Sequence, residues 1–209
     1  MIKVTPKDVI FDTSNLSMTT HELILELNSN TNKSLELVTH QIKGLSETQR
    51  SWKSDTNSWN INEIFAHLNA FSSYYNATFL YKFEVTKFKT PTDEFISSPL
   101  GRSAWKSMKL GNAKNVKRKF NAIRTMNPKT NSELNTINSI EDFEHNLTQL
   151  LTIITRSATV NIRKVKIPIS FSKIVRLRLG DALLYVVYHN ERHVQQALNL
   201  INHPNFPKV

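Results

Sequence analysis

Two histidines in the C-terminal part of the chain have the spacing of a metal-ligand pair. His189 and His193 are four residues apart in a stretch whose apolar residues recur at helical spacing. Their imidazoles would therefore stack one turn apart on a single helix face, where both could bind one metal ion. Such pairs also arise by chance on many helices. Glu191 does not complete a metalloprotease motif, because that motif has glutamate directly after the first histidine, where this chain has Asn190.

A third histidine, His67, lies in a second stretch with strong helical signals. Asn60 and Glu63 form a capping box, and Trp59 and Ile64 fit the positions of a hydrophobic staple. A single histidine beside an apolar face is usually a core or boundary residue. On a facing helix, however, it could supply a third nitrogen ligand and leave open positions for water.

The apolar pattern of the chain predicts an all-α fold. Few glycines and four long helical periods favour a four-helix bundle with a long connection between the second and third helices. Bundles of this kind build metal sites from side chains on facing helices. The expected helices cover residues 20–44, 61–83, 140–158 and 182–202. Their expected N-terminal signals are Thr19 with Glu22, Asn60 with Glu63, Ser139 with Asp142, and Asp181 after Gly180, which is expected to break whatever precedes it.

The remaining segments carry weaker signals. Residues 1–17 have the pattern of an irregular arm. Residues 84–138 contain Pro91, Pro99 and Pro128 among polar clusters, so we expect an irregular basic insertion there, with a short basic helix at residues 113–126. Residues 169–178 fit either an extended segment or a short helical one, and His145 is expected to be exposed.

Composition excludes several classes of protein. At 209 residues the chain is expected to form one domain, residues 1–209. The absence of cysteine excludes disulfides, zinc–thiolate sites and a cysteine nucleophile, and it suits a reducing, cytoplasmic location. With four glycines and no glycine-rich phosphate loop, a Rossmann or P-loop fold is not expected. We expect no signal peptide and no membrane partner, because no apolar run approaches spanning length.

The net charge of +10 is concentrated in one segment. Residues 82–129 hold 12 Lys/Arg against 3 Asp/Glu, a net +9, and the rest of the chain is near neutral in sum. Such a block indicates either a surface for a polyanion or a solvated, lysine-rich connector. The connector is favoured, because the block lacks regularly interleaved aromatics and any helix-turn-helix or RNA-binding signature. We therefore expect no sequence-specific nucleic-acid binding, and any binding to duplex DNA should weaken steeply with salt.

The two histidine-bearing stretches resemble the two signature helices of the DinB-like superfamily. The first motif is Trp59-x-Ile61-x-Glu63-Ile64-x-x-His67-Leu68, and the second is Leu179-Gly180-Asp181-Ala182 followed by His189-x-x-x-His193-x-x-Gln196. The segment Leu45-Ser46-x-x-Gln49-x-x-Trp52 is similar to the one that precedes the first signature. The tail Pro204-Asn205-Phe206-Pro207 is similar to that of a metal-binding branch. The third expected helix matches only by pattern, and the basic insertion hardly at all.

The resemblance implies a four-helix bundle in which His67, His189 and His193 hold a divalent metal, often nickel or zinc, and it implies frequent homodimers. Relatives include thiol transferases that use bacillithiol or mycothiol, a maleylpyruvate isomerase and hydrolase-like proteins, while many members have no established activity. The leading hypothesis is a metal-dependent hydrolase or thiol transferase acting on a small molecule, with a low-molecular-weight thiol as a possible co-substrate. Tyr185 and Gln196 would border the site, and no catalytic residue is assigned.

Two other hypotheses remain open at the level of sequence. The chain could be a non-catalytic binding module that uses residues 82–129 to hold an acidic partner or nucleic acid, with the metal only structural. The histidine cluster could also be metal-free packing. Alanine at His67 would distinguish the enzyme from the binding module, because it should abolish an enzymatic activity and leave polyanion binding intact.

Overall fold

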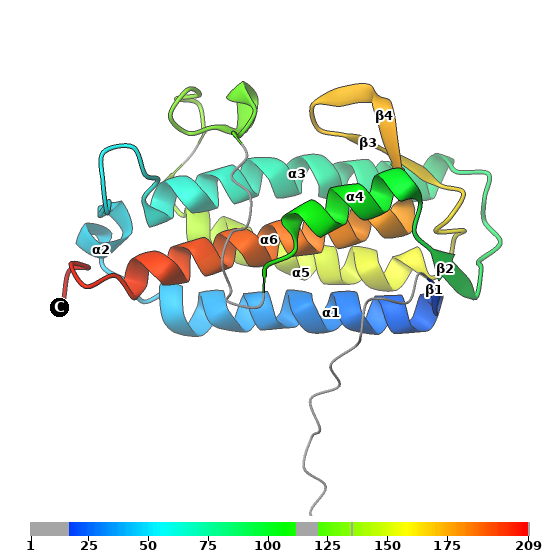
Figure 1. Cartoon of the computed structure of the whole chain (residues 1–209), viewed down its shortest axis with the longest axis horizontal. Helices are drawn as coiled ribbons and strands as arrows, with labels where there is room; N and C mark the ends of the chain where they lie inside the picture. The colour runs from blue at the N-terminus through cyan, green and yellow to red at the C-terminus, as the bar shows by residue number, and fades with distance from the viewer. Residues whose placement is uncertain (1–16, 112–120, 135, 209) are drawn as a thin grey trace, which may run out of the picture.

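The protein is mostly helical, with two small two-stranded sheets (Figure 1). The computed structural model describes residues 17–111, 121–134 and 136–208. The four expected helices are present, and their ends differ from the expected ones by a few residues. They are α1 (Thr20–Leu37), which continues into the π-helical turn η1 (Val38–Ile42), α3 (Ile61–Val85), α5 (Ser139–Ser157) and α6 (Leu179–Ile201).

The shorter elements surround the long helices. They are β1 (Ser17–Thr19), α2 (Glu47–Ser51), β2 (Glu94–Ile96), α4 (Pro99–Met108), the 3-10 turn η2 (Arg124–Met126), β3 (Lys166–Ile169) and β4 (Ser172–Arg178). Strand β1 pairs with β2, and β3 pairs with β4, both antiparallel. None of the described helices combines the length and the hydropathy needed to cross a membrane.

Helix α6 is the central element of the fold. It packs against α1, α3 and α4, while α5 packs against α1 and α3 (Figure 1). The apolar core divides into two clusters along this helix. The larger cluster contains Phe79 and Leu183, and the smaller contains Phe143 and Val194. On α3 the change from the smaller to the larger cluster falls between Leu68 and Phe71, and on α6 it falls between Tyr188 and Val194, so His67 and His189 lie next to this boundary.

Two of the expected helix starts are confirmed and one is displaced. Both Thr19 with Glu22 and Asn60 with Glu63 form complete capping boxes. The third expected start, Ser139 with Asp142, is wrong by one residue. Asn138 occupies the N-cap with a φ of 56° and makes no side-chain cap, so Ser139 is already helical. Asparagine tolerates this left-handed conformation better than most residues, which explains the shift.

The expected cap of the last helix is also wrong, because Asp181 lies inside α6. Strand β4 runs directly into the helix, and backbone carbonyls satisfy the first amides: Leu179 N donates to Val165 O and Gly180 N to Ile162 O. The buried Asp181 carboxylate instead accepts hydrogen bonds from Ser97 and Ser98 at the start of α4.

Glycine permits the close approach of this segment to α6. A Cβ on Gly101 would lie 2.0 Å from Cγ of Asp181, and one on Gly180 would lie 2.5 Å from Cε2 of Phe95. Both distances are shorter than any real contact, so each position requires glycine. Gly180 is thus a packing residue within the helix, and it does not mark a break before α6, which begins at Leu179.

The segment expected to be an irregular insertion contains a helix. Ser98 caps α4, and Pro99 occupies the first helical position, where proline is favoured because its missing N–H would be unpaired anyway. The sequence interpretation treated this proline only as a breaker. The ring of Trp105 on α4 packs 5.9 Å from that of Tyr188 on α6. Of the expected basic helix at 113–126, residues 113–120 lie outside the described residues, and residues 124–126 form only a 3-10 turn.

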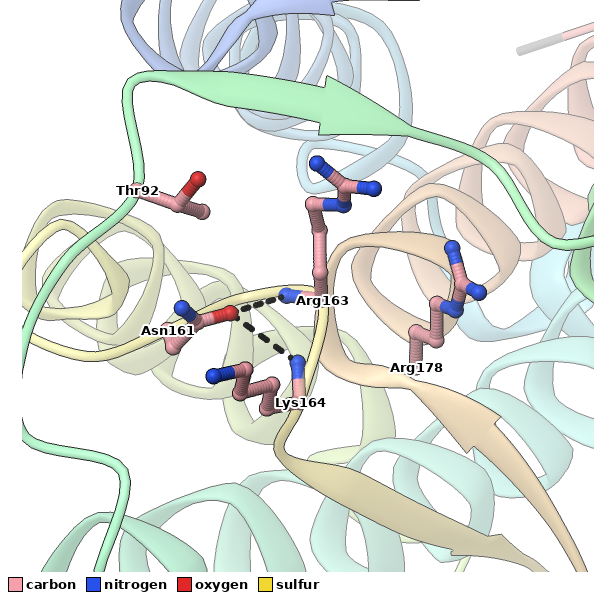
Figure 2. A pocket seen from close by; sticks show the side chains of 5 residues that line it. All are labelled: Thr92, Asn161, Arg163, Lys164 and Arg178. Carbon is pink, nitrogen blue, oxygen red and sulfur yellow. Dashed lines mark hydrogen bonds between the residues drawn. The ribbon is translucent and has the colours of Figure 1, made fainter.

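The stretch before α6 is extended, which settles the alternative left open for residues 169–178. Strands β3 and β4 form a hairpin that projects beside α3 (Figure 1). The turn that leads into β3 is held by Asn161, whose Oδ1 accepts hydrogen bonds from the backbone amides of Arg163 (3.2 Å) and Lys164 (3.1 Å) (Figure 2).

Candidate metal centre

The three histidines singled out from the sequence lie together. His67 comes from the first turns of α3, and His189 and His193 come from the middle of α6. Their ligand nitrogens all lie within 4.8 Å of one another. In the described part of the chain, no other group of three His, Cys, Asp or Glu residues is placed in this way. The predicted juxtaposition of His67 with the pair on the last helix is therefore confirmed.

A backbone carbonyl orients the ring of His67. Its Nδ1 lies 2.7 Å from the carbonyl oxygen of Met126, and since a carbonyl only accepts, Nδ1 carries the proton. The other nitrogen, Nε2, then holds a lone pair, and it lies 3.3 Å from Nε2 of His189. A hydrogen bond from the remote ring nitrogen to a carbonyl is the usual support of a metal-binding histidine.

The two histidines of α6 are held in different ways. Nδ1 of His193 donates to Oε1 of Gln196 at 2.9 Å, which leaves Nε2 of His193 as the lone-pair nitrogen. The ring of His189 stacks on Phe71, with centroids 3.6 Å apart and planes 12° from parallel. Its Nδ1 is buried without a hydrogen-bond partner. The ring of His189 is therefore positioned by apolar packing.

Aromatic rings surround the cluster. Trp59, the residue before the N-cap of α3, packs 5.0 Å from the ring of His67 and 6.2 Å from that of His193. His67 and His189 are buried, and His193 is half-buried. This shell is most complete around His67 and His189 and less complete around His193.

Burial keeps all three imidazoles uncharged. It lowers the pKa of His67 and, with the neighbouring rings of His193 and His67, holds the pKa of His189 well below its usual range. Burial and the His67 ring lower the pKa of His193 to about 3. At neutral pH the cluster therefore offers lone pairs and no positive charge.

The donor set fits a divalent transition metal. In a tetrahedral zinc site with Zn–N bonds of about 2.0–2.1 Å, neighbouring nitrogens lie about 3.3 Å apart. The separation of Nε2 in His67 and Nε2 in His189 is 3.3 Å, and all three ligand nitrogens lie within 4.8 Å of one another. Imidazole nitrogen suits zinc, copper, iron and nickel, whereas magnesium and calcium prefer oxygen.

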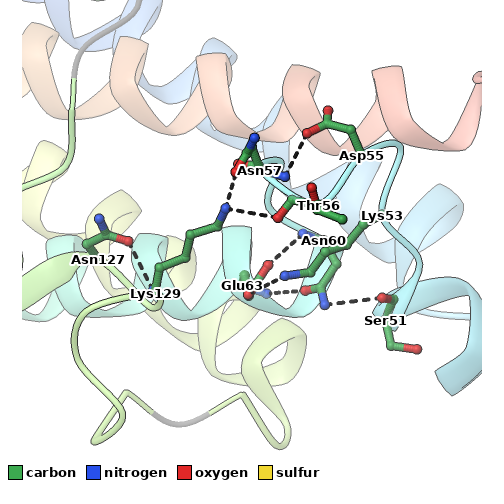
Figure 3. Close-up of polar contacts among 9 residues, drawn as sticks. All are labelled: Ser51, Lys53, Asp55, Thr56, Asn57, Asn60, Glu63, Asn127 and Lys129. Carbon is green, nitrogen blue, oxygen red and sulfur yellow. Dashed lines mark hydrogen bonds and ion pairs between the residues drawn. The ribbon is translucent and has the colours of Figure 1, made fainter.

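Two loops beside the site are tied together by Lys129. The loop before α3 carries Trp59, and the loop after η2 follows the carbonyl of Met126. Nζ of Lys129 donates to the carbonyl oxygens of Asn57 (2.6 Å) and Thr56 (3.4 Å), which joins the two loops (Figure 3).

The start of α3 is held from the same side. Glu63 accepts a backbone hydrogen bond from Asn60 at 2.9 Å and pairs with Nζ of Lys53 at 2.7 Å (Figure 3). The role assigned to Glu63 from the sequence, as a capping residue, is confirmed. The cap fixes where α3 begins and so fixes the register of His67.

Sequence reasoning found the ligand candidates and missed their supports. Gln196 borders the site as expected, and the ring of Tyr185 lies 6.4 Å from that of His189. The stacking of Phe71 could have been found, since it lies one helical turn after His67. The carbonyl of Met126 had no sequence signal, because any residue could supply it.

Comparison of the chain with family models, curated proteins and solved structures gave no match. The resemblance to the DinB-like superfamily therefore stays a prediction that rests on the two motifs.

Proposed function

We propose that this chain is a DinB-like protein in which the four long helices form a four-helix bundle around a three-histidine metal centre. On this proposal, the protein is a metal-dependent hydrolase or thiol transferase that acts on a small electrophilic molecule. The observation that carries it is the convergence of three uncharged imidazoles on one point, two of them with their remote nitrogens already hydrogen-bonded.

The residues of the site would have separate roles. His67, His189 and His193 would hold zinc or nickel, and the ion would supply Lewis acidity that lowers the pKa of a water or thiol at an open position. Trp59 and Phe71 would exclude bulk water and keep the rings fixed. The half-buried His193 marks the side from which a substrate could approach.

The thiol-transfer reaction is balanced without an oxidant. The thiol sulfur forms a bond to the electrophilic carbon and its proton passes to solvent. The bond to the leaving group breaks, and the leaving group departs with that electron pair. Hydrolysis follows the same course with water in place of the thiol.

The basic segment gives less support to a binding module. Several of its described lysines are engaged within the molecule: Lys89 donates to the carbonyl of Phe83, Lys129 to those of Thr56 and Asn57, and the ammonium of Lys109 lies 5.0 Å from the ring centre of Tyr188. These contacts fit a connector that covers the helices.

Elemental analysis tests the metal part of the proposal. Protein purified without a nickel column should carry close to one zinc or nickel ion per chain, and the His67→Ala variant should carry almost none. His145→Ala is the matched control, because His145 is exposed on α5. A parent protein without metal that also fails to take up zinc or nickel on dialysis would favour metal-free packing.

A substrate screen tests the catalytic part. The metal-loaded protein is offered small electrophiles with and without a low-molecular-weight thiol, and turnover is compared with that of His67→Ala. Turnover that depends on His67 supports the proposal. Stoichiometric metal with no turnover in any arm would point to a structural metal.

A further inference from the structure

A basic cavity lies at the N-terminal end of α6, away from the histidines. Its volume is about 430 Å³, and it is lined by Thr92, Asn161, Arg163, Lys164 and Arg178 (Figure 2). Arg178 is the N-cap of α6, so the cavity lies roughly 15 Å along the helix from His189, at 1.5 Å per residue. Three of the five lining side chains are cationic, and none is acidic.

The cationic groups are only partly engaged. Nη1 of Arg178 donates to the carbonyl of Ile96 at 2.9 Å, and Nη1 of Arg163 lies 3.2 Å from Oε2 of the exposed Glu94. Lys164 forms no ion pair with any residue that the structure describes. Each guanidinium has five donors, so most of this hydrogen-bonding capacity remains available.

The turn beneath the cavity is rigid. The Oδ1 atom of Asn161 holds the backbone amides of Arg163 and Lys164 (Figure 2). These two cations are consecutive in the chain, and their backbone is fixed by the same side chain. The two hydrogen bonds therefore hold the backbone of both residues before any ligand arrives, which lowers the entropy cost of ordering this turn on binding.

The segment that supplies four of the five lining residues is itself basic, and Glu94 from β2 offsets one of its charges. Residues 158–180 contain six Lys/Arg and no Asp or Glu. This second basic segment was hidden in the sequence, because acidic residues elsewhere balance it in the sum. Like charges that line one cavity repel each other, and a multiply charged anion would relieve that repulsion.

We propose that this cavity binds the phosphoryl group of a small diphosphate or phosphate ester. Arginine presents a planar fork that matches phosphate oxygens, and lysine adds a point charge. The backbone of α6 contributes little, because the amides of Leu179 and Gly180 are already bonded to carbonyls. Recognition therefore rests on the side chains of Arg163, Lys164 and Arg178. The site is independent of the metal centre.

The test is a titration of the full-length protein with inorganic diphosphate, glycerol phosphate and inorganic phosphate at constant ionic strength. Binding is followed by calorimetry and by amide chemical shifts. We expect saturable shifts at the amides of Asn161, Arg163 and Lys164. The probe that binds with the highest affinity identifies the source of the phosphoryl group: diphosphate, ester or free ion.

Two double variants separate a built site from a basic surface. The cavity variant is Arg163→Gln with Lys164→Gln. The control variant, Arg176→Gln with Lys173→Gln, makes the same change in charge on exposed residues of β4 outside the cavity. The cavity variant should weaken diphosphate binding roughly tenfold, as expected for losing charged hydrogen bonds at a partly exposed site. The control variant should change it by less than about twofold.

Other outcomes would overturn the proposal. Equal weakening in both double variants would mean that diphosphate responds to net charge alone. The absence of saturable binding with all three probes would also refute the site. His189→Ala should bind diphosphate like the parent. Loss of binding in that variant would show that the anion binds at the histidine centre. Thermal unfolding confirms that each variant is folded.

Discussion

The middle and the N-terminal end of α6 gather nitrogen-rich side chains under opposite conditions. In the middle of the helix, His189 and His193 meet His67 among aromatic rings, and burial holds their pKa values low. At the N-terminal end, the basic side chains of Arg163, Lys164 and Arg178 line an open cavity. Both clusters could bind an ion, but the ions have opposite sign. The buried cluster offers lone pairs to a cation, and the exposed one offers N–H donors to an anion.

The difference shows that burial decides what such a cluster can bind. Desolvation disfavours the charged form of a side chain, and histidine can release its proton where arginine cannot. A residue that can become neutral is therefore suited to the apolar boundary between the two core clusters. Residues that cannot become neutral are suited to a rim that water reaches.

The largest expected effect comes from removing one ligand at the buried end. His189→Ala leaves two imidazoles, and zinc affinity should fall by at least about 100-fold, more than is usual for loss of a supporting residue. Competition with a chromogenic chelator measures this. The apolar packing of α6 should keep the variant folded. A triple alanine variant of His67, His189 and His193 that bound zinc as tightly as the parent would show that the metal lies elsewhere.

The next effect tests whether the histidine cluster depends on packing at the N-terminal end of α6. Gly101→Ala forces a Cβ to 2.0 Å from Cγ of the buried Asp181, so α4 must shift away from α6. Overpacking of this kind should lower the free energy of unfolding by about 1–3 kcal/mol. Gly44→Ala is the control, because its Cβ would meet nothing within 4 Å. Denaturant unfolding measures both.

Zinc affinity of Gly101→Ala sharpens the same point. If the histidine end is held by its own contacts, the affinity should equal that of the parent in the folded variant. A large drop in zinc affinity would mean that packing at the N-terminal end of α6 positions the histidines, and the two regions would then have to be treated as one unit.

The contrast between the histidine cluster and the basic cavity also explains what the sequence could predict. Helical periodicity revealed α1, α3, α5 and α6, and the i,i+4 pair with a capped facing helix revealed the metal centre. These signals are local or repeat along one face. The partners of Asp181 could not be found in this way, because Ser97 and Ser98 lie just before α4, more than 80 residues earlier. An aspartate after glycine reads as a cap unless that contact is known.

The basic cavity was missed for a related reason. Arg163, Lys164 and Arg178 come together only because β3 and β4 form a hairpin, and the sequence left open whether residues 169–178 were extended. Thr92 joins them from a segment that pattern analysis assigned to an irregular insertion. A site assembled from turns has no period to detect.

The pH dependence of stability should distinguish the buried histidine cluster from the basic cavity. In metal-free protein the folded-state pKa of each ligand histidine lies below the unfolded value of 6.5. Below pH 6.5 the unfolded chain binds more protons than the folded one, so the free energy of unfolding falls as the pH is lowered. Each histidine contributes up to about 1.4 kcal/mol per pH unit in that window.

Denaturant unfolding between pH 5 and 7.5 measures this slope. A variant with glutamine at positions 67, 189 and 193 is the control and should show a shallower dependence. Equal slopes would mean that the three imidazoles titrate in the folded protein as they do in the unfolded chain, and the contrast between the neutral histidine cluster and the basic cavity would be lost.

The smallest effect concerns the loops beside the histidines. Lys129→Gln removes the hydrogen bonds to the carbonyls of Asn57 and Thr56, and so releases the loop that follows Met126 from the loop that carries Trp59. The carbonyl of Met126 would then hold the ring of His67 less firmly. Because these bonds are exposed, we expect zinc affinity to fall only about two- to fivefold. Lys173→Gln makes the same change in charge at the far hairpin and should leave zinc affinity unchanged. If both variants lowered zinc affinity equally, the effect of Lys129 would be one of net charge, and the histidine centre would not depend on its loops for position.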